Sequence, residues 1–413
     1  MGADHLPVTQ SLLSTFDRVT KLIRSGHVSA VYTPGMGGIL EAVMKMSFGN
    51  GFGFTFAPNL TLSDLRRYRY GSFLLEVDEE VGQLIGTITE TQEIICGEEK
   101  VALSELQAAW EGKLESVYPT CASADTLPVK TLTGSERVSI FPSLKVAKPR
   151  VLIPAFPGTN CEYDSARAVE DAGGDARIMV INNLSAEGIA RSIDSFAKEI
   201  EKSQMIFIPG GFSGGDEPDG SAKFITAFFR NQAIKESVMD LLQKRDGLMC
   251  GICNGFQALI KLGLVPYGKI IDADAHAPTL TFNTIGRHQS RLVRTRIVSN
   301  RSPWLRKVSI GDIITVPISH GEGRFFADED VLKQLIASEQ IATQYVDLDG
   351  EATMDIRFNP NGSCLAIEGI TSPDGRVFGK MGHSERIGSG LYKNVPGNYN
   401  IHMFESAVAY FKG

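Results

Sequence analysis

Three features are scarce in this sequence of 413 residues: long apolar runs, excess basic charge and cysteines at framework spacings. No uninterrupted apolar stretch approaches the ~20 residues that a membrane-spanning helix needs. The formal net charge is −7 and the pI is near 5.6, which argues against a nucleic-acid surface as the main function. The first residues lack the basic and then apolar pattern of a secretory signal. We therefore expect a cytoplasmic protein whose partners include neither nucleic acid nor a membrane.

The six cysteines are too scattered to suggest a disulfide framework, which fits a reducing compartment. Cys250 and Cys253 form a single C-x-x-C, but no second pair of cysteines or histidines completes a zinc site. We therefore expect no metal in this chain. Cys161 and Cys250 are expected to fill core positions, which is the common role of a free cysteine.

The pattern of the sequence divides it into three parts. Residues 121–149 are rich in Ser, Thr, Pro and Lys and are predicted to be a linker. Residues 1–120 combine an amphipathic helix at 8–26 with short strands, which predicts a small α+β domain. Residues 150–413 alternate short apolar strands with helices, which predicts right-handed βαβ units. The expected fold class is α/β, with a doubly wound, mostly parallel sheet after the smaller α+β domain.

In the larger domain the apolar pattern predicts particular elements. Strands are expected at 150–154, 176–181, 205–208, 247–250, 291–298, 313–318, 364–370 and 377–381. Helices are expected at 164–172, 186–200, 256–264 and 403–411. Because ligands bind beyond the carboxyl ends of the strands in an open parallel sheet, loops that follow the strands are expected to carry the site.

A glycine-rich loop at residues 33–38 lies between a predicted strand and helix in the first domain. Such a loop can offer backbone N–H groups to a phosphate. It is not followed by Lys-Ser/Thr and its spacing is not a dinucleotide fingerprint. Tight packing of the helix against the strand explains the glycines equally well.

The most informative stretch is LMCGICNGFQ, from Leu248 to Gln257. An apolar strand ends at Gly251, Cys253 follows, and Gly255 opens a new apolar helix, which is the pattern of a nucleophile elbow. Glycine at both positions allows close approach of neighbouring backbone. The N-terminus of the helix favours the thiolate form of Cys253. From these residues alone, a reactive thiol and a buried packing cysteine remain equally open.

A nucleophilic thiol needs a base, and the base needs a residue that orients it. Five of the seven histidines lie in terminal or polar stretches and are expected to be solvated or structural: His5, His27, His276, His288 and His402. His383 directly follows a predicted strand, and Glu385 at i+2 lies on the same side of an extended segment. Glu385 can therefore bind one imidazole nitrogen while the other faces Cys253. These three residues are the predicted catalytic triad.

Several separated motifs, in this order, resemble class I glutamine amidotransferases. They are the loop Pro209-Gly210-Gly211, the elbow Gly251-Ile252-Cys253-Asn254-Gly255 with Gln257, and His383-Ser384-Glu385. More narrowly, residues 157–161, 211–216 and 319–324 look like the glutaminase part of the phosphoribosylformylglycinamidine synthase family. The resemblance covers roughly residues 150–413. Residues 1–120 resemble the C-terminal, aminoimidazole ribonucleotide synthetase-like subdomain of that enzyme's synthetase, through residues 29–42, 48–50 and 110–119.

The resemblance implies that Cys253 attacks the carboxamide of glutamine and that His383 relays the proton. Glu385 is then expected to orient His383. Four further residues are expected to stabilise the oxyanion through backbone N–H groups or to contact glutamine: Gly211, Phe212, Asn254 and Gln257. Three more are expected to face glutamine or the synthetase interface, or to form a buried structural network: His320, Glu322 and Arg324.

The resemblance also implies partners. Ammonia released from glutamine is expected to pass to a synthetase portion, in cis or in trans, that converts formylglycinamide ribonucleotide to the amidine in purine biosynthesis. ATP and Mg²⁺ are expected to bind that portion, because no segment here resembles its ATP-binding part. This chain is itself expected to need no cofactor.

Two other functions remain open from the sequence. The chain could be another cysteine hydrolase of the same fold, such as a γ-glutamyl hydrolase, and an assay of glutamine against small peptides separates the two. It could also be a partner-binding fragment that is silent until the synthetase portion docks. Restoration of activity by that portion would distinguish this case.

Overall fold

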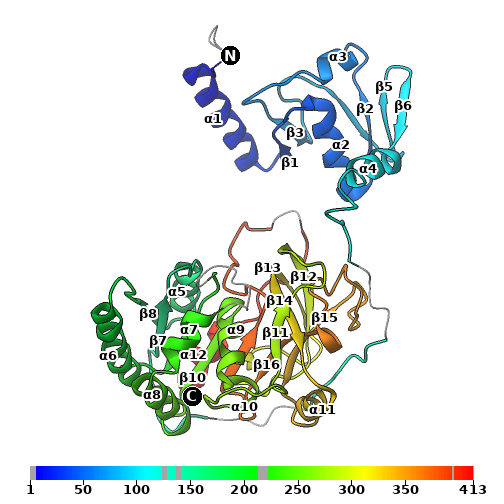
Figure 1. The fold of residues 1–413 in the computed structure, drawn as a ribbon. Coiled ribbons are helices and arrows are strands. Elements are labelled where there is room, and N and C mark those ends of the chain that lie inside the picture. Colours follow the sequence, from blue (N-terminus) through cyan, green and yellow to red (C-terminus); the bar gives the residue numbers. More distant parts are fainter. Residues whose placement is uncertain (1–5, 123–127, 136–140, 213–221, 393–394, 413) are drawn as a thin grey trace. The chain divides into compact units, whose positions relative to one another are not determined.

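The structure is a computed structural model that describes residues 6–122, 128–135, 141–212, 222–392 and 395–412. The chain divides into two units, Met1–Thr120 and Cys121–Gly413 (Figure 1). Each unit has a hydrophobic core of its own. No helix in the described residues is both long enough and apolar enough to cross a membrane.

The first unit is an α+β structure with two small sheets. Its helices are α1 (Thr9–Ser25), α2 (Gly38–Asn50), α3 (Leu62–Leu65) and α4 (Leu103–Glu111). Its strands are β1 (Val28–Tyr32), β2 (Gly53–Phe56), β3 (Leu74–Val77), β4 (Gly86–Thr89), β5 (Glu93–Cys96) and β6 (Glu99–Ala102). One sheet pairs β1 with β3, and the other has the order β4-β2-β5-β6. Its core is apolar side chains from α2, α3, α4, β2 and β5.

The glycine-rich loop at residues 33–38 is explained by packing. The N–H of Gly37 donates to Glu41 Oε2 at 2.8 Å, so a carboxylate already occupies the place that a bound anion would need. A Cβ on Gly38 would lie 2.4 Å from the carbonyl oxygen of Leu65, which shows how closely α2 approaches the neighbouring backbone. The loop is therefore a tight helix entry rather than a phosphate cradle.

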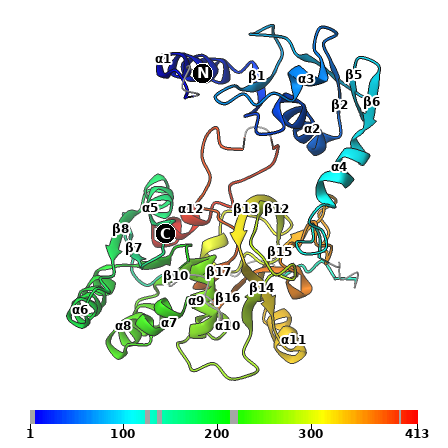
Figure 2. The same ribbon diagram turned by 45° about the horizontal axis from the view of Figure 1, so that its top comes forward.

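The second unit is built around a nine-stranded sheet with the order β13-β12-β15-β16-β17-β10-β9-β7-β8. Its strands are β7 (Arg150–Ala155), β8 (Asp175–Val180), β9 (Met205–Ile208), β10 (Leu248–Ile252), β12 (Gln289–Ile297), β13 (Ile313–His320), β15 (Ile341–Val346), β16 (Ile367–Thr371) and β17 (Val377–Lys380). Strands β8, β7, β9, β10 and β17 are parallel, and β16, β15, β12 and β13 continue the sheet in antiparallel fashion. Strands β16 and β17 therefore lie at the middle of the sheet (Figure 2). The predicted α/β class is confirmed.

Helices cover both faces of the parallel part. They are α5 (Glu162–Asp171), α6 (Ala186–Lys202), α7 (Lys223–Phe229), α8 (Gln232–Gln243), α9 (Asn254–Leu262) and α12 (Met403–Lys412). The connections β7-α5-β8 and β8-α6-β9 run in opposite directions across the sheet, so right-handed crossovers place α5 and α6 on opposite faces. Helix α12 packs beside α5, whereas α7, α8 and α9 continue the layer of α6. Aromatic pairs fill both layers, with Phe207 against Phe404 at 5.3 Å and Phe196 against Phe229 at 5.7 Å between ring centroids.

The remaining elements were only partly predicted from the sequence. The structure adds β11 (Thr279–Phe282), β14 (Glu322–Phe326), α10 (Leu264–Tyr267) and α11 (Glu329–Ala337), and β15 was not predicted either. Strand β16 begins at Ile367 because residues 364–366 form a 3-10 turn. The described residues of the expected linker hydrogen-bond to the second unit, with Gly134 donating to Val298 and Val146 to Phe411. The described residues of the expected linker therefore belong to the second unit.

The close approach of α9 to β9 generates a stability prediction. A Cβ on Gly255 would lie 2.0 Å from the carbonyl oxygen of Ile208. We expect Gly255→Ala to destabilise the second unit by at least about 2 kcal/mol, because backbone must move to accept the methyl group. Fluorescence of the buried Trp304 during urea unfolding, in a Trp110→Phe background, measures this unit. Gly388→Ala is the control, since its Cβ would meet only Leu391 at 3.6 Å. Equal stability of the two variants would contradict the prediction.

Candidate active site

Cys253 stands on a strained turn between β10 and α9. Its backbone has φ 54° and ψ −107°, a positive-φ conformation outside the allowed regions and unfavourable for any residue with a Cβ. Its N–H donates to the carbonyl oxygen of Lys380 at 2.9 Å, at the end of the neighbouring strand β17. Its Sγ lies 3.7 Å from the carbonyl oxygen of Ser319, and the residue is 4% exposed. Strain of this kind gathers at functional sites, where the surrounding fold maintains it.

His383 reaches the same edge of the sheet by way of β17. Strands β10 and β17 are parallel neighbours, with Ile252 opposite Lys380. Cys253 and His383 therefore both follow the carboxyl ends of adjacent parallel strands, where open sheets bind their ligands. The N–H of His383 donates to the carbonyl oxygen of Pro317 at 2.8 Å, which ties the loop to β13.

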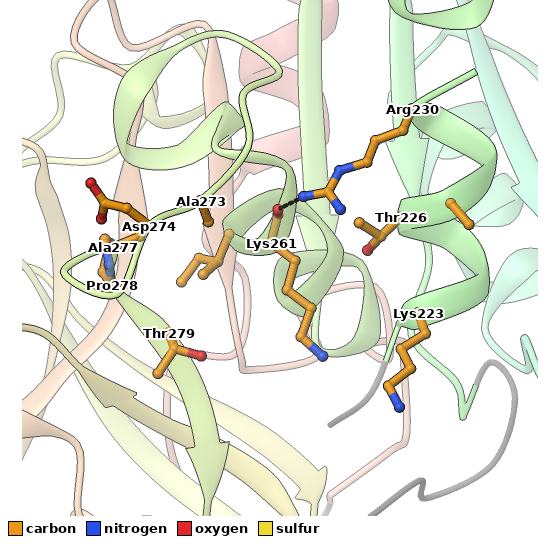
Figure 3. Close-up of a pocket in the computed structure, with 11 residues that line it drawn as sticks. Lys223, Thr226, Arg230, Lys261, Ala273, Asp274, Ala277, Pro278 and Thr279 are labelled. Carbon is orange, nitrogen blue, oxygen red and sulfur yellow. Dashed lines mark hydrogen bonds between the residues drawn. The ribbon is translucent and has the colours of Figure 1, made fainter. Parts of the chain in front are cut away.

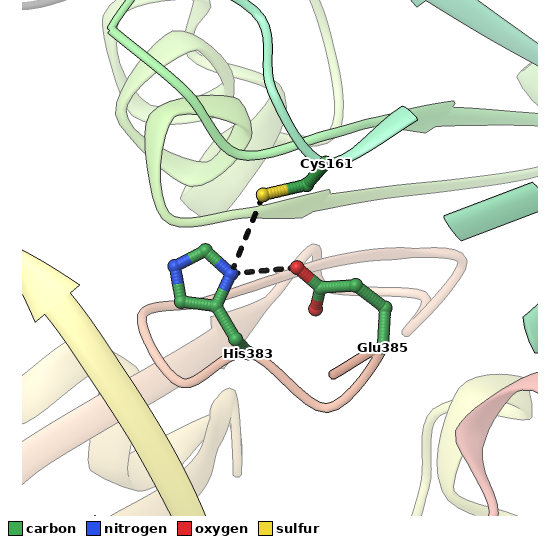
Figure 4. A group of neighbouring side chains, drawn as sticks. All are labelled: Cys161, His383 and Glu385. Carbon is green, nitrogen blue, oxygen red and sulfur yellow. Dashed lines mark hydrogen bonds and ion pairs between the residues drawn. The ribbon is translucent and has the colours of Figure 1, made fainter. Parts of the chain in front are cut away.

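The imidazole of His383 is held by Glu385. Nδ1 lies 2.6 Å from Oε1 of Glu385, and both residues are 1% exposed (Figure 4). Burial alone would lower the pKa of His383, but the charges of Glu385 and Cys253 raise it well above its usual value. Burial alone would raise the pKa of Glu385, but the charge and hydrogen bond of His383 lower it. Among the described residues Nε2 of His383 has no hydrogen-bond partner, so this nitrogen is open to a reacting group.

Cys161 is fully buried in the core, as predicted from the sequence. It also approaches His383, a contact that the sequence did not predict, with Sγ 3.9 Å from Nδ1 of His383 (Figure 4). Nη2 of Arg386 donates to the same sulfur at 2.8 Å. Cys161 follows the carboxyl end of β7, so its place at this edge was the available clue. Cys250, by contrast, is fully buried in β10, and burial raises the pKa of its thiol well above the usual value.

A buried ion pair positions the loop that carries His383. Nζ of Lys380 lies 3.2 Å from Oε1 of Glu368, and both side chains are almost wholly buried. The same Nζ donates at 3.0 Å to the carbonyl oxygen of Gly382 and to Oγ of Ser384. Glu368 in turn accepts from the N–H of Gly382 at 2.7 Å and from Oγ1 of Thr343 at 2.5 Å. The residues on either side of His383 are therefore fixed by one charged pair.

The predicted oxyanion donors have different surroundings. The N–H of Phe212 donates to the carbonyl oxygen of Gly158 at 2.8 Å, so in the described conformation it is already engaged. Gly211 follows the end of β9, and a Cβ on it would lie 2.4 Å from the carbonyl oxygen of Gly158. Asn254 is the first residue of α9 and directly follows Cys253.

Gln257 ties the elbow helix to β14. Its Nε2 donates to the carbonyl oxygen of Glu322 at 2.6 Å, and its Oε1 accepts from Nδ2 of Asn254 at 2.9 Å. Both amide ends are thus engaged within the protein. A contact with bound glutamine, as the resemblance implied, would require exchange of one of these bonds.

The motif at residues 319–324 belongs largely to a buried polar network. His320 is 2% exposed and its Nε2 lies 3.3 Å from Nδ2 of Asn361, which also donates to the hydroxyl of Tyr345. Burial, together with the positive charges of His383 and His288, lowers the pKa of His320 to about 3. His320 is therefore neutral. Glu322 is buried as well, and Arg324 is half-buried.

A cavity of about 380 Å³ lies away from these residues (Figure 3). It is lined by residues of α7, the C-terminal end of α9 and the segment before β11, including Lys223, Arg230 and Lys261. Nη2 of Arg230 donates to the carbonyl oxygen of Lys261 at 3.1 Å. None of the lining residues belongs to the predicted site.

Sequence comparison matches residues 148–411 to the CobB/CobQ-like glutamine amidotransferase domain. The chain belongs to this family. Curated relatives of this amidotransferase include the phosphoribosylformylglycinamidine synthase subunit PurQ of Methanococcus maripaludis, 34% identical over 64% of this chain and 97% of the relative. The PurQ subunit of Salinibacter ruber is 33% identical over 62% of this chain and 94% of the relative. Among solved structures, PurLQS from Thermotoga maritima is 25% identical, with a TM-score of 0.45, over 64% of this chain and 99% of the matched chain.

These matches bear on the resemblance stated from the sequence. The amidotransferase assignment of roughly residues 150–413 is confirmed by the family match. Residues 1–147 lie outside the matched range, so the synthetase-like identity of the first unit stays a prediction.

The ion pair of Lys380 and Glu368, which holds the loop that carries His383, gives a second stability prediction. Lys380→Met leaves Glu368 buried without its cation, and we expect a loss of about 3–5 kcal/mol in the stability of the second unit. Lys380→Met combined with Glu368→Gln should recover part of that loss. The measurement is urea unfolding followed by Trp304 fluorescence. Lys333→Met removes an exposed ion pair with Glu329 and should change stability by less than about 0.5 kcal/mol. A loss as small as this in Lys380→Met would refute the account.

The charge of Glu385 gives a pH prediction. In Glu385→Gln the burial of His383 persists while the carboxylate that raises its pKa is gone, so the pKa of His383 should fall. The imidazolium should then lose its proton at lower pH than in the unsubstituted protein, as measured by NMR titration of labelled histidine. Glu405→Gln, beside the half-exposed His402, should leave the titration of His383 unchanged. An unchanged or higher pKa of His383 in Glu385→Gln would show that Glu385 does not set the protonation state of His383.

Proposed function

We propose that this chain is the glutaminase part of a phosphoribosylformylglycinamidine synthase, a glutamine-hydrolysing carbon–nitrogen ligase. Cys253 is the nucleophile, His383 the general base and acid, and Glu385 the residue that orients His383. One observation carries the proposal: Cys253, at a strand-to-helix turn with positive φ, interacts electrostatically with His383, and Nδ1 of His383 is bound to a buried glutamate. The names of the PurQ relatives support the choice of ligase.

The first half-reaction releases ammonia. Nε2 of His383 takes the proton of the Cys253 thiol, and the sulfur attacks the side-chain carbonyl carbon of glutamine. The imidazolium is stabilised by the carboxylate of Glu385, which is why the raised pKa of His383 suits the role. The same proton then passes to the departing nitrogen, so that ammonia leaves and a glutamyl thioester remains. Water, activated by His383, hydrolyses the thioester to glutamate.

The tetrahedral intermediate needs donors at its oxyanion. The N–H groups of Gly211 and Asn254 are the proposed pair, because both lie at the carboxyl edge of the sheet near the nucleophile. Preorganised donors of this kind contribute about 3–4 kcal/mol each to the barrier. The N–H of Phe212 would join them only after it separates from Gly158.

The fate of the ammonia completes the proposal. A synthetase portion, in cis or in trans, would use ATP and Mg²⁺ to activate the amide of formylglycinamide ribonucleotide, and ammonia would replace its oxygen. The purine pathway and the free state of all six cysteines favour the cytoplasm as the compartment. The first unit exposes apolar side chains on α1, including Leu13, Phe16 and Ile23, as expected of a piece of a larger synthetase domain.

One observation favours a second candidate function, in which the glutaminase activity depends on the synthetase portion. Cys253 is 4% exposed, and the N–H of Phe212 is held by Gly158, so the described conformation is not arranged for turnover. We therefore expect weak glutaminase activity from the chain alone and stimulation when the synthetase portion is added. A γ-glutamyl hydrolase would instead prefer small γ-glutamyl peptides over free glutamine.

The assignment of the nucleophile has a direct test. Cys253→Ala should abolish glutamine hydrolysis, because it removes the thiol proposed to form the thioester. It should also abolish covalent labelling by a glutamine-like electrophile, with peptide mapping to locate the label. Cys364→Ala removes a half-buried cysteine outside the site and should retain both properties. Labelling of another cysteine in Cys253→Ala would overturn the assignment.

A further inference from the structure

Two buried side chains, those of Cys161 and Glu385, meet on one side of the His383 ring. Sγ of Cys161 and Oε1 of Glu385 both approach Nδ1, at 3.9 Å and 2.6 Å, while the Nε2 edge faces away from them (Figure 4). One ligand atom from each of the three residues lies within 4.8 Å of the others. The second carboxylate oxygen of Glu385 is buried and has no hydrogen-bond partner among the described residues.

We propose that Cys161, His383 and Glu385 form an inhibitory site for a thiophilic divalent cation such as Zn²⁺. Thiolate, imidazole and carboxylate are the ligands that zinc prefers. With metal–ligand distances of about 2.0–2.3 Å, the edges of a tetrahedral site are about 3.3–3.6 Å long. The separation of Cys161 from Nδ1 is within a few tenths of an ångström of that length, and Glu385 would shift slightly outward. A water molecule would supply the fourth ligand.

Charge also favours the site. A thiolate at Cys161 and the carboxylate of Glu385 together balance a divalent cation. Nη2 of Arg386 donates to the sulfur of Cys161 at 2.8 Å, so this cation would separate from the sulfur when the metal binds. Metal binding would release the thiol proton of Cys161 and the Nδ1 proton of His383 to solvent.

The cation would stop the chemistry without touching Cys253. When a metal occupies Nδ1, a neutral imidazole carries its proton on Nε2. Nε2 then cannot accept the thiol proton, and Glu385 no longer holds the ring. The consequence for turnover rests on the proposed glutaminase function, whereas the binding of the metal does not.

Cobalt titration of the full chain tests binding separately from activity. In a Cys253→Ala background, Co²⁺ should produce a thiolate-to-cobalt absorption band that saturates at one ion per chain. Cys161→Ser added to that background should abolish the band, and Cys364→Ser, the matched control, should retain it. Glu385→Gln should retain a thiolate band while it lowers Co²⁺ affinity by about 10-fold or more. This second variant remains informative if Cys161→Ser fails to fold.

Two results would overturn the proposal. One is a cobalt band that persists without Cys161. The other is a cobalt band that forms in the unsubstituted chain but is lost in Cys253→Ala, because the metal would then be bound to Cys253. Inhibition of glutamine hydrolysis by Zn²⁺ tests whether metal binding stops turnover. Relative to each protein's own metal-free rate, Cys161→Ser should need about 10-fold more Zn²⁺ for half inhibition. Absence of glutaminase activity even after the synthetase portion is added, with an intact cobalt band, would refute the proposed function alone.

Discussion

The position of His383 depends on the buried ion pair of Lys380 and Glu368, and neither residue has a role in the proposed reaction. Lys380 and Glu368 are both withdrawn from water, so each needs the other, and the lysine also needs the carbonyl of Gly382 and the hydroxyl of Ser384. These bonds bracket His383 along the chain. A buried pair of this kind contributes little net stability but strongly penalises any arrangement that separates its members. Its value here is that the loop has one conformation, and hence the imidazole has one orientation.

Cys253, the proposed nucleophile, is positioned by backbone rather than by side chains. Adjacent parallel strands β10 and β17 end in register, and the N–H of Cys253 is bound to the last residue of β17. Glycines 251 and 255 allow the turn, since a Cβ on either would collide with main-chain atoms. Cys253 and His383 therefore come together through the sheet itself, and the strain at Cys253 is maintained by the packing of α9. The family match covers the whole of this sheet.

The sequence was sufficient for the parts of the structure that repeat a local pattern. Apolar runs of the right length predicted the parallel strands and the helices between them, and the glycine spacing predicted the elbow. It was insufficient where tertiary contacts decide. Strand β15 is buried on both faces and carries no alternation, so its type could not be read from periodicity. Cys161 looked like a core residue, because only the folded sheet brings it to His383. The role of Lys380 was equally hidden, since a lysine in a strand predicts exposure.

The two separate hydrophobic cores have a consequence for any measurement on the whole chain. We expect each core to melt on its own, so that a heat scan is a sum of two transitions rather than one all-or-none event. A single melting temperature would then average a small α+β unit with one more than twice its length. Calorimetric enthalpies must accordingly be apportioned between the units before they are compared with those of a one-unit protein.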